Sequence, residues 1–373
     1  MLENKLKYII HVFPKSDFQA SVAQPEGLHP FYTSSQELVS FCDIAKYPSD
    51  SITMGTGGNA CINYSTVPFS TSTDCFNFRC MKNNTKFLYY WIYSKLNVID
   101  DLYFWGMGLR HLQKPLFCNQ HIMLPSMNEQ QQIVNYLDKK VSIIDKLIAN
   151  IKQQIDDLIR YKNNVIVEVV TRGLHDNVQT KESDVDIIGR IPCHWVIKRL
   201  KYLCAFETGN MDTQDAVDDG IYPFYVRSPI VERSSKYTFC GTAILMAGDG
   251  VGAGKVFHYV SGKYAVHQRV YRFSRFKNIN SKFLFYFLQN RFSEQMGKGS
   301  AQSTVPSIRL PMLQNFLVCV PPENEQEEIV KYIDRQVSKV DFLLDIKQRK
   351  IEELTKYKKS LIYECVTGKK EVL

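Results

Sequence analysis

The sequence predicts an α+β protein in which two globular domains, rich in β-strands and carrying short helices, are separated by two long antiparallel coiled-coil helices. The stretch NEQQQIVNYLDKKVSIID at 128–145 returns at 324–341 as NEQEEIVKYIDRQVSKVD, an offset of 196 residues. Each copy opens a run whose apolar residues are spaced alternately three and four apart, and each follows a segment of short β-rich runs. The chain therefore reads as a tandem repeat with pseudo-twofold symmetry.

The two long helices are predicted from their ends and their apolar spacing. Asn128 and Asn324 are candidate N-caps, with Gln131 and Glu327 three residues later as in a capping box. Glycines that suit helix ends follow at Gly173 and Gly368. Between these ends the apolar seam is sustained for about five heptads, which is typical of a coiled coil. The positions chosen for helix pairing and partner docking are Leu137, Ile144, Ile151, Leu158, Ile333, Val340, Ile351 and Leu354.

A seam of that length, roughly 60 Å at 1.5 Å per residue, needs a partner helix. Pairing with a second molecule is one alternative. Pairing within the chain is favoured, because the link after residue 173 lets the chain reverse. The expected organisation is a first domain over 1–126, a first helix over 127–172, a linker over 173–190, a second domain over 191–321, a second helix over 322–368 and a tail over 369–373.

The globular segments repeat more weakly than the helices. NTKFLYYWIYSKL at 84–96 matches NSKFLFYFLQNRF at 280–292 with the same offset, and an amphipathic helix is expected near 281–293. Short β-rich runs precede it, among them YPFYV, TAILMA, KVFHYV and KYAVHQRVYRF. Because the helices match well and the globular segments mainly in framework, each domain is expected to bind something different.

Several classes of protein are excluded by composition. No apolar run approaches the roughly 18–20 residues that span a bilayer, and Glu3 stands where a signal peptide needs positive charge. We expect a soluble, uncleaved protein of a bacterial or archaeal cytoplasm, without membrane partners. The ten cysteines stand singly, with no Cys-x-x-Cys pair, which argues against structural zinc and for reduced thiols.

Motifs for chemistry are missing as well. GTAILMAGDGVGAGKVFHYV at 241–260 is no P-loop, because Asp249 stands where glycine is required and Val256 follows Lys255. A strand rather than a helix follows, so a β-hairpin with a glycine-rich tip is favoured over a dinucleotide-binding turn. His267 is expected to be a strand residue rather than a general base. The chain is predicted to bind no metal or cofactor and to be no enzyme by itself.

The net charge of +8 is concentrated in one segment. Residues 191–319 carry 16 Lys and Arg against 8 Asp and Glu, whereas the other segments are nearly balanced. A basic surface of this kind indicates a polyanion such as double-stranded DNA, with a merely solvated surface as the alternative. The candidate DNA contacts of the second domain are Arg227, Ser228, Arg233, Lys236, Lys255, Gln268, Lys298, Ser300, Gln302 and Ser303. Those of the first domain are Thr33, Ser34, Thr56, Asn59, Asn63 and Arg110.

The whole pattern resembles the specificity subunit of Type I restriction–modification systems. The resemblance rests on LPSMNEQQQIVNYLD, on VPPENEQEEIVKYID, on the helix ends EVVTRGL and ECVTGKK, and on IGRIPCHWVIKRLKYL at 188–203. It implies two target recognition domains that each read one half of a bipartite DNA sequence, with the helices fixing the gap between the halves. It also implies two methyltransferase subunits that use S-adenosylmethionine, and restriction and translocase subunits that use ATP and Mg²⁺. Docking faces are expected on the helices and their ends, along Asp145, Lys146 and Asp341.

One departure from the family concerns the first domain. The lead-in IPCHW precedes the second domain but has no counterpart before the first, which predicts an N-terminally short first domain. Its near-neutral charge points the same way, so DNA reading by the first half is expected to be weaker. A coiled-coil adaptor whose globular ends bind proteins is the competing interpretation of the sequence.

Overall fold

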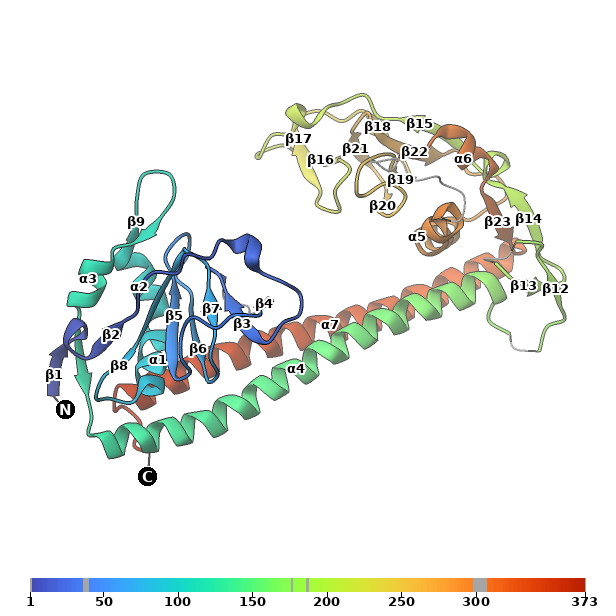
Figure 1. Cartoon of the computed structure of the whole chain (residues 1–373). Coiled ribbons are helices and arrows are strands. Elements are labelled where there is room, and N and C mark those ends of the chain that lie inside the picture. Colours follow the sequence, from blue (N-terminus) through green and yellow to red (C-terminus); the bar gives the residue numbers. More distant parts are fainter. Residues whose placement is uncertain (1, 36–39, 176, 186–187, 298–306, 373) are drawn as a thin grey trace. The chain divides into compact units, whose positions relative to one another are not determined.

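The computed structural model describes residues 2–35, 40–175, 177–185, 188–297 and 307–372 (Figure 1). The chain divides into two compact units: unit 1 comprises residues 1–152 and 347–373, and unit 2 comprises residues 153–346. The division crosses both long helices, α4 (Met127–Arg172) and α7 (Glu323–Val366). Each unit therefore holds one globular part and a stretch of each long helix.

Unit 1 alternates short strands with small helices before α4. Its strands are β1 (Leu2–Lys5), β2 (Ile10–Val12), β3 (His29–Tyr32), β4 (Phe41–Cys42), β5 (Ser51–Gly55), β6 (Ile62–Ser65), β7 (Ser70–Thr71), β8 (Cys75–Cys80), β9 (Phe104–Trp105), β10 (His111–Leu112) and β11 (His121–Leu124). Its helices are α1 (Thr85–Ser94), α2 (Leu96–Tyr103) and α3 (Lys114–Asn119), with 3₁₀ turns η1 (Leu6–Tyr8) and η2 (Ala20–Val22).

Unit 2 follows the same plan. Its strands are β12 (Thr180–Glu182), β13 (Arg190–Pro192), β14 (Val196–Arg199), β15 (Ala205–Thr208), β16 (Tyr222–Tyr225), β17 (Glu232–Ser234), β18 (Phe239–Cys240), β19 (Ala243–Ala247), β20 (Phe257–Val260), β21 (Lys263–Val266), β22 (Val270–Ser274) and β23 (Leu317–Val320). Its helices are α5 (Ser281–Gly297) and α6 (Leu310–Asn315), with 3₁₀ turns η3 (Leu200–Tyr202) and η4 (Thr213–Asp215).

The two globular parts share one sheet topology. A four-stranded antiparallel sheet has the order β2-β8-β5-β6 in unit 1 and β15-β22-β19-β20 in unit 2. A second sheet contains one parallel pair in each unit, β3 with β7 and β16 with β21. The strand that opens each globular part pairs with the strand before its long helix, β1 with β11 and β14 with β23. Among the described residues the repeat therefore extends to these three sheets, whereas the second sheet has three strands in unit 1 and four in unit 2, and the pairs β9-β10 and β12-β13 each occur in one unit only.

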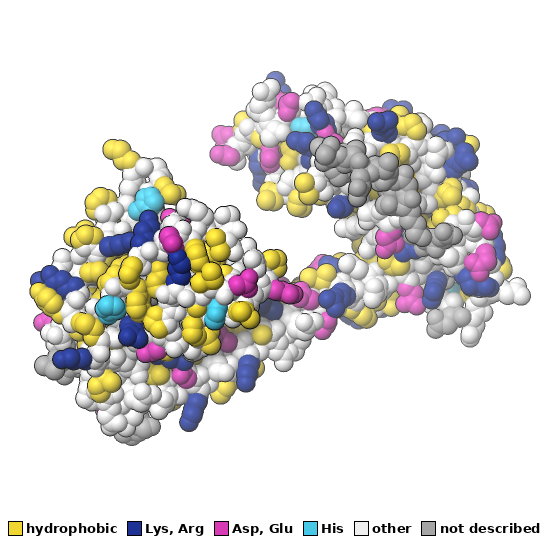
Figure 2. All heavy atoms as spheres, in the orientation of Figure 1, with side chains coloured by type: hydrophobic (Ala, Val, Ile, Leu, Met, Phe, Trp, Pro, Cys, Tyr) yellow, Lys and Arg dark blue, Asp and Glu magenta, His cyan; other side chains and the backbone are white. Residues whose placement is uncertain are grey.

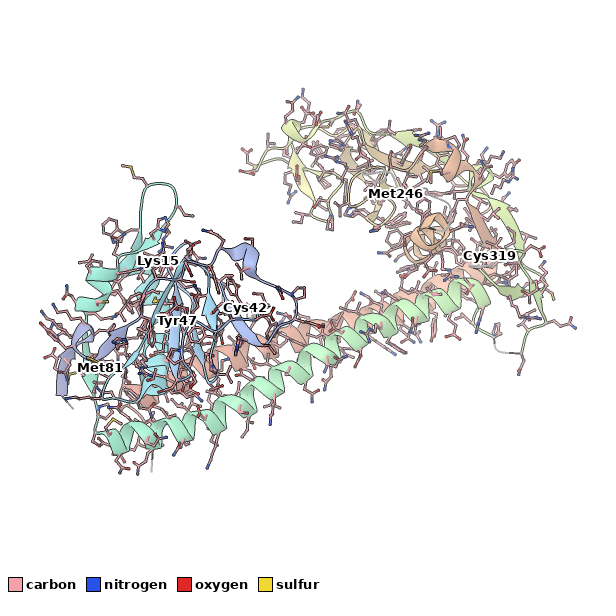
Figure 3. The ribbon with its side chains drawn as sticks, viewed as in Figure 1. Lys15, Cys42, Tyr47, Met81, Met246 and Cys319 are labelled. Atoms are coloured by element: carbon pink, nitrogen blue, oxygen red, sulfur yellow. The ribbon has the colours of Figure 1, made fainter. Side chains whose placement is uncertain are left out.

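The central strand of each four-stranded sheet explains where the core lies. All five residues of β5 and all five of β19 are buried, since these strands are covered on both faces. The helices α1 and α5 pack against these strands and their neighbours β6 and β20. Met246 of β19 and Cys319 of β23 lie inside unit 2, as Tyr47 and Cys42 do in unit 1 (Figure 3).

Two expectations about local structure are confirmed. β19 and β20 form an antiparallel hairpin, as predicted for 241–260, and α5 covers the helix expected near 281–293. His267, expected to be a strand residue, is buried and forms a parallel β-bridge with Met211 directly after β21. The run KYAVHQRVYRF is nevertheless two strands in two different sheets, because the chain turns after His267. The Nδ1 of His267 accepts a hydrogen bond from the backbone of Arg269 at 3.0 Å, so the ring stabilises the turn.

The N-caps of the long helices, by contrast, differ from the prediction. α4 begins at Met127, so Asn128 is its second residue and not its N-cap. Instead, the backbone and hydroxyl of Ser126 donate to Glu129 at 2.8 and 2.7 Å, and Glu129 N–H donates back to Ser126. These hydrogen bonds lower the pKa of Glu129. The sequence pattern placed the cap two residues late because Ser126 already satisfies the first turn.

Gln131 and Glu327, predicted as the capping-box partners of Asn128 and Asn324, do not cap the helices. α7 begins at Glu323 directly after Pro322, so Asn324 again lies inside the helix. Gln131 accepts a hydrogen bond from the Asn84 side chain at 2.9 Å, and Glu327 lies 3.8 Å from Lys331 one turn on. At the other ends, Gly173 and Gly368 adopt positive φ of 80° and 74°, directly after α4 and two residues after α7.

Two larger cores hold the long helices to their globular parts. In unit 1 the core joins Val134, Leu137 and Ile144 of α4 with Leu361 and Cys365 of α7. The core of unit 2 joins Ile166, Val169 and Val170 of α4 with Ile329 and Ile333 of α7. Within the described part of the chain, no helix is long and apolar enough to cross a membrane.

Candidate nucleic-acid interface

A glutamine in the first turn of each long helix anchors the globular part. Gln130 accepts a hydrogen bond from the backbone of Asn84 at 3.0 Å and donates to Pro125 O at 3.0 Å. Gln326 makes the same two bonds in unit 2, from Asn280 at 2.6 Å and to Pro321 at 2.8 Å. Both glutamines are buried. The repeated Asn-Glu-Gln therefore serves to dock the helix against its globular part.

An aspartate two turns later completes this anchor. Asp138 accepts hydrogen bonds from Lys86 at 2.8 Å and from Tyr90 at 2.6 Å, both on α1. In unit 2 Asp334 accepts from Lys282 at 2.8 Å and from Tyr286 at 2.5 Å. Burial and then these hydrogen bonds raise the pKa of both tyrosines, so each phenol stays protonated and donates. The anchor fixes the orientation of each globular part on its helix.

The basic side chains of unit 2 include one pair that is held in place. Arg227 donates to Asp249 at 3.1 Å, and Arg269 donates to its other carboxylate oxygen at 2.6 Å. Burial alone would raise the pKa of Asp249, but the hydrogen bonds from the two arginines outweigh it and lower that pKa. The side chains of Arg227 and Arg269 remain 43% and 60% exposed. Two guanidinium groups thus stand at the surface beside the glycine-rich loop 248–256.

The other described candidates of unit 2 lie on β17 or on loops and turns. Arg233, Lys236 and Lys255 are exposed, and Arg233 donates to Ile221 O at 3.4 Å. Ser228 accepts from the backbone of Ile230 at 3.1 Å, and Gln268 donates to Asp212 at 2.8 Å. Lys298, Ser300, Gln302 and Ser303 lie outside the described residues. Figure 2 shows Lys and Arg side chains distributed over the visible face of unit 2.

The candidates of unit 1 are mostly engaged with the protein itself. Arg110 donates to Asp100 at 2.9 Å and to the carbonyls of Phe104 and Asp100, which holds the β9–β10 loop. The hydroxyl of Ser34 donates to Asp74 O at 2.8 Å, and Asn63 donates to Ser35 O at 3.2 Å. Thr33 and Thr56 are half-buried, and Asn59 is exposed in the β5–β6 turn.

The eight candidates for pairing and docking on the helices all point inward. Leu137, Ile144, Ile333 and Val340 are buried, and Ile151, Leu158, Ile351 and Leu354 are half-buried. Each unit has an ion pair that connects α4 to α7. Lys358 contacts Asp145 at 2.7 Å in unit 1, and Lys162 contacts Asp341 at 2.9 Å in unit 2. The later residue of α4 thus contacts the earlier residue of α7, so the two helices run antiparallel. Because the two pairs correspond at the offset of 196, the helices have the same register in both units. Asp145 and Asp341, expected on a docking face, thus contact the neighbouring helix.

Sequence reasoning missed two residues of the arginine cluster and the partners of the two helix aspartates. Asp249 was read only as a failed P-loop glycine, and Arg269 only as part of a strand. The partners of Asp138 and Asp334 were overlooked too, although Lys86 and Lys282, like Tyr90 and Tyr286, repeat at the offset of 196. Polar residues that are identical at corresponding positions of the two halves could have revealed these partners. No group of three or more His, Cys, Asp or Glu side chains in the described ranges could hold a metal ion.

Comparison with known proteins gives one consistent result. The model of the Type I restriction modification DNA specificity domain matches residues 5–157 and 192–356. The chain is 25% identical to the Type I restriction enzyme MjaVIII specificity subunit of Methanocaldococcus jannaschii, over 74% of this chain and 72% of that protein. It is 29% identical to the Type I restriction enzyme EcoDI specificity subunit of Escherichia coli, over 41% of this chain and 33% of that protein.

A solved structure shares the fold. It belongs to work on the complex assembly and conformational transition of the type I R-M system, and it matches with a TM-score of 0.69 at 14% identity. The match covers 98% of this chain and 97% of that chain. The similarity therefore includes both globular parts and both long helices.

Proposed function

Because the chain belongs to the family of Type I restriction–modification specificity subunits, we propose that it is the DNA-binding subunit that reads a bipartite target, one half with each globular part. Specificity subunits are non-catalytic components of the restriction–modification complex, and accordingly the chain is no enzyme by itself and needs no cofactor of its own. Reading in two halves is supported by the repeat of one sheet topology in two separate units.

The observation that carries the proposal is the arginine pair of unit 2. Arginine is the side chain that reads guanine most often, through two parallel hydrogen bonds in the major groove. Asp249 restrains Arg227 and Arg269, so less side-chain entropy is lost when they meet a base. Lys236, Lys255 and Arg233, exposed elsewhere on unit 2, would supply charge for phosphates. The excess of 16 basic over 8 acidic residues in 191–319 supports this assignment.

Unit 1 would read its half with neutral side chains. Residues 1–125 carry 10 Lys and Arg against 9 Asp and Glu, so they contribute little attraction to phosphates. Asn59 is exposed and Thr56 half-buried in the β5–β6 turn, which corresponds to the glycine-rich loop of unit 2. We propose that this turn contacts base edges through the asparagine amide and the threonine hydroxyl.

Partner docking is proposed for the outer face of the long helices. Leu147 and Tyr357 of unit 1 correspond at the offset of 196 to Leu343 and Tyr161 of unit 2. All four side chains are exposed, at 47%, 55%, 43% and 51% respectively. Two equivalent apolar spots suit two copies of one methyltransferase subunit. S-adenosylmethionine would be bound by those subunits, and ATP with Mg²⁺ by restriction and translocase subunits.

The test is a methylome. The chain is co-expressed with its neighbouring methyltransferase subunit in a host that lacks DNA methylation, and modified bases are read by direct sequencing. A split motif with a fixed gap is expected. A single half-motif would mean that only one unit reads DNA. No new methylation from an assembled complex would contradict the proposal.

Substitutions in unit 2 show which half of the DNA motif this unit reads. Arg227→Ala with Arg269→Ala should relax or abolish one half of the motif and leave the other unchanged, whereas Arg335→Ala, an exposed arginine on α7, should change neither. Each lost bidentate contact is worth about 1–3 kcal/mol of discrimination. The adaptor interpretation makes the opposite prediction, that affinity for DNA is weak and changes little between 50 and 200 mM salt.

A further inference from the structure

An indole ring fills the end of the helix pair in unit 2. Trp195 is completely buried, and its Nε1 donates to Glu325 at 2.9 Å in the first turn of α7. The ring lies against Gly173, since a Cβ on that glycine would approach it to 3.3 Å. His194 adds a second contact to the same carboxylate at 2.6 Å. Trp195 shares its core with Ile329 of α7 and with Val169 and Val170 of α4.

Unit 1 has a cavity at the equivalent place. It measures about 360 Å³ and is lined by residues from the start of α4 and by residues at and beyond the end of α7. Four residues of its lining correspond at the offset of 196 to residues around Trp195: Glu129 to Glu325, Ile133 to Ile329, Cys365 to Val169 and Val366 to Val170. Gly368 lines it with positive φ, as Gly173 does in unit 2.

Strand register shows what differs between the two sites. Trp195 directly precedes β14, and β14 corresponds to β1, since both pair with the strand before a long helix. The residue before β1 is Met1, which lies outside the described residues and whose side chain has no N–H to donate. Glu129 accepts instead from Ser126, and the residue at this position in unit 2 is Pro322.

We propose that the cavity of unit 1 is a binding site for a tryptophan side chain carried by an extended peptide of a partner protein. The chain has three tryptophans, of which Trp91 and Trp195 are buried in their own cores. Trp105 lies on β9 and is 53% exposed. The peptide that fits resembles the lead-in of unit 2, in which Ile191, four residues before the tryptophan, is also completely buried. The indole packs between Ile133 and Val366, and its N–H donates to Glu129.

The probe is a fluorescein-labelled peptide with the sequence of residues 188–195, Ile-Gly-Arg-Ile-Pro-Cys-His-Trp, in which serine replaces the cysteine. Fluorescence polarisation with the full chain should show saturable binding. A peptide with alanine in place of tryptophan should bind at least tenfold more weakly. Equal binding of both peptides, or none, would overturn the proposal. DNA is absent from this assay, so its outcome is independent of the proposed function.

The location is tested by filling the cavity. Ile133→Trp should weaken peptide binding at least tenfold, whereas Ile143→Trp, an exposed position on the same helix, should leave it unchanged. If Ile133→Trp fails to fold, a photo-crosslinking analogue of the peptide's tryptophan is used with the natural chain. Crosslinks to 125–133 or 365–372 support the site, and crosslinks elsewhere refute it. If the protein self-associates and Trp105→Ala abolishes this association, the occupant of the cavity is a second copy of the chain. That result would refute the assignment to a partner protein.

Discussion

Single residues decide how each globular part is held, and the clearest case is the aspartate on each long helix. Asp138 and Asp334 accept from a lysine and a tyrosine of α1 and α5, respectively. Hydrogen bonds to a charged group contribute more than neutral ones, about 1.5–3 kcal/mol. These bonds connect the globular part to the helix at a point two turns beyond the buried glutamine. Together the two contacts prevent the globular part from turning on the helix.

Asp138→Asn is therefore expected to destabilise unit 1 by about 1–3 kcal/mol, because the amide removes the charge that Lys86 and Tyr90 share. Hydrogen exchange followed by mass spectrometry should show faster exchange in α1 and in the start of α4, with α5 unchanged. Asp334→Asn should give the mirror result in unit 2. Asp101→Asn, at an exposed position of α2, serves as the control. Exchange that rises equally in both units would contradict the assignment.

Cysteine reactivity gives a second prediction at this scale. Burial raises the pKa of Cys80 and Cys204 to about 12, and Cys193 and Cys240 are exposed. Since only the thiolate reacts, buried thiols stay protonated and inert below about pH 11. Iodoacetamide at pH 8 should label Cys193 and Cys240 within minutes and leave Cys80 and Cys204 unlabelled, as read by peptide mass spectrometry. In 6 M guanidinium all ten should react. Rapid labelling of Cys80 in the native protein would refute its burial.

At the scale of helices and strands, structure that depends on local spacing could be predicted from the sequence, and structure that depends on distant residues could not. The long helices were predictable because their spacing is local, and α4 ends at Arg172 as expected. The caps were not, since a cap depends on which nearby hydroxyl reaches the first turn, here Ser126. Residues 263–273 were read as one strand run because β propensity cannot show that a turn after His267 sends β21 and β22 to different sheets. The Arg227–Asp249–Arg269 cluster joins residues that are 22 and 20 positions apart, and no local pattern reveals it.

The pairing of α4 with α7 also leads to a prediction. Lys162→Asp should destabilise unit 2 by about 0.2–1 kcal/mol, because the ion pair with Asp341 becomes a repulsion at the edge of the seam. Adding Asp341→Lys should recover most of the loss, and the recovery should shrink in 1 M salt. The same exchange at Asp145 and Lys358 is the matched test in unit 1. Thermal unfolding of the four variants in each cycle measures the coupling. A cycle without coupling would mean that the pair contributes nothing to pairing.

For the whole molecule, the proposed role of the helices is to fix the gap between two half-targets. Seven residues preserve the heptad seam, so one heptad can be inserted into both helices, between Lys152 and Gln153 and between Ile346 and Lys347. The insertion lengthens each helix by about 10 Å, which equals roughly three base pairs of 3.4 Å. The methylome should then show the same two half-motifs with a gap longer by about three base pairs. A heptad inserted into α4 alone breaks the register and should abolish methylation. An unchanged gap in the doubly extended chain would show that the helices do not set the spacing.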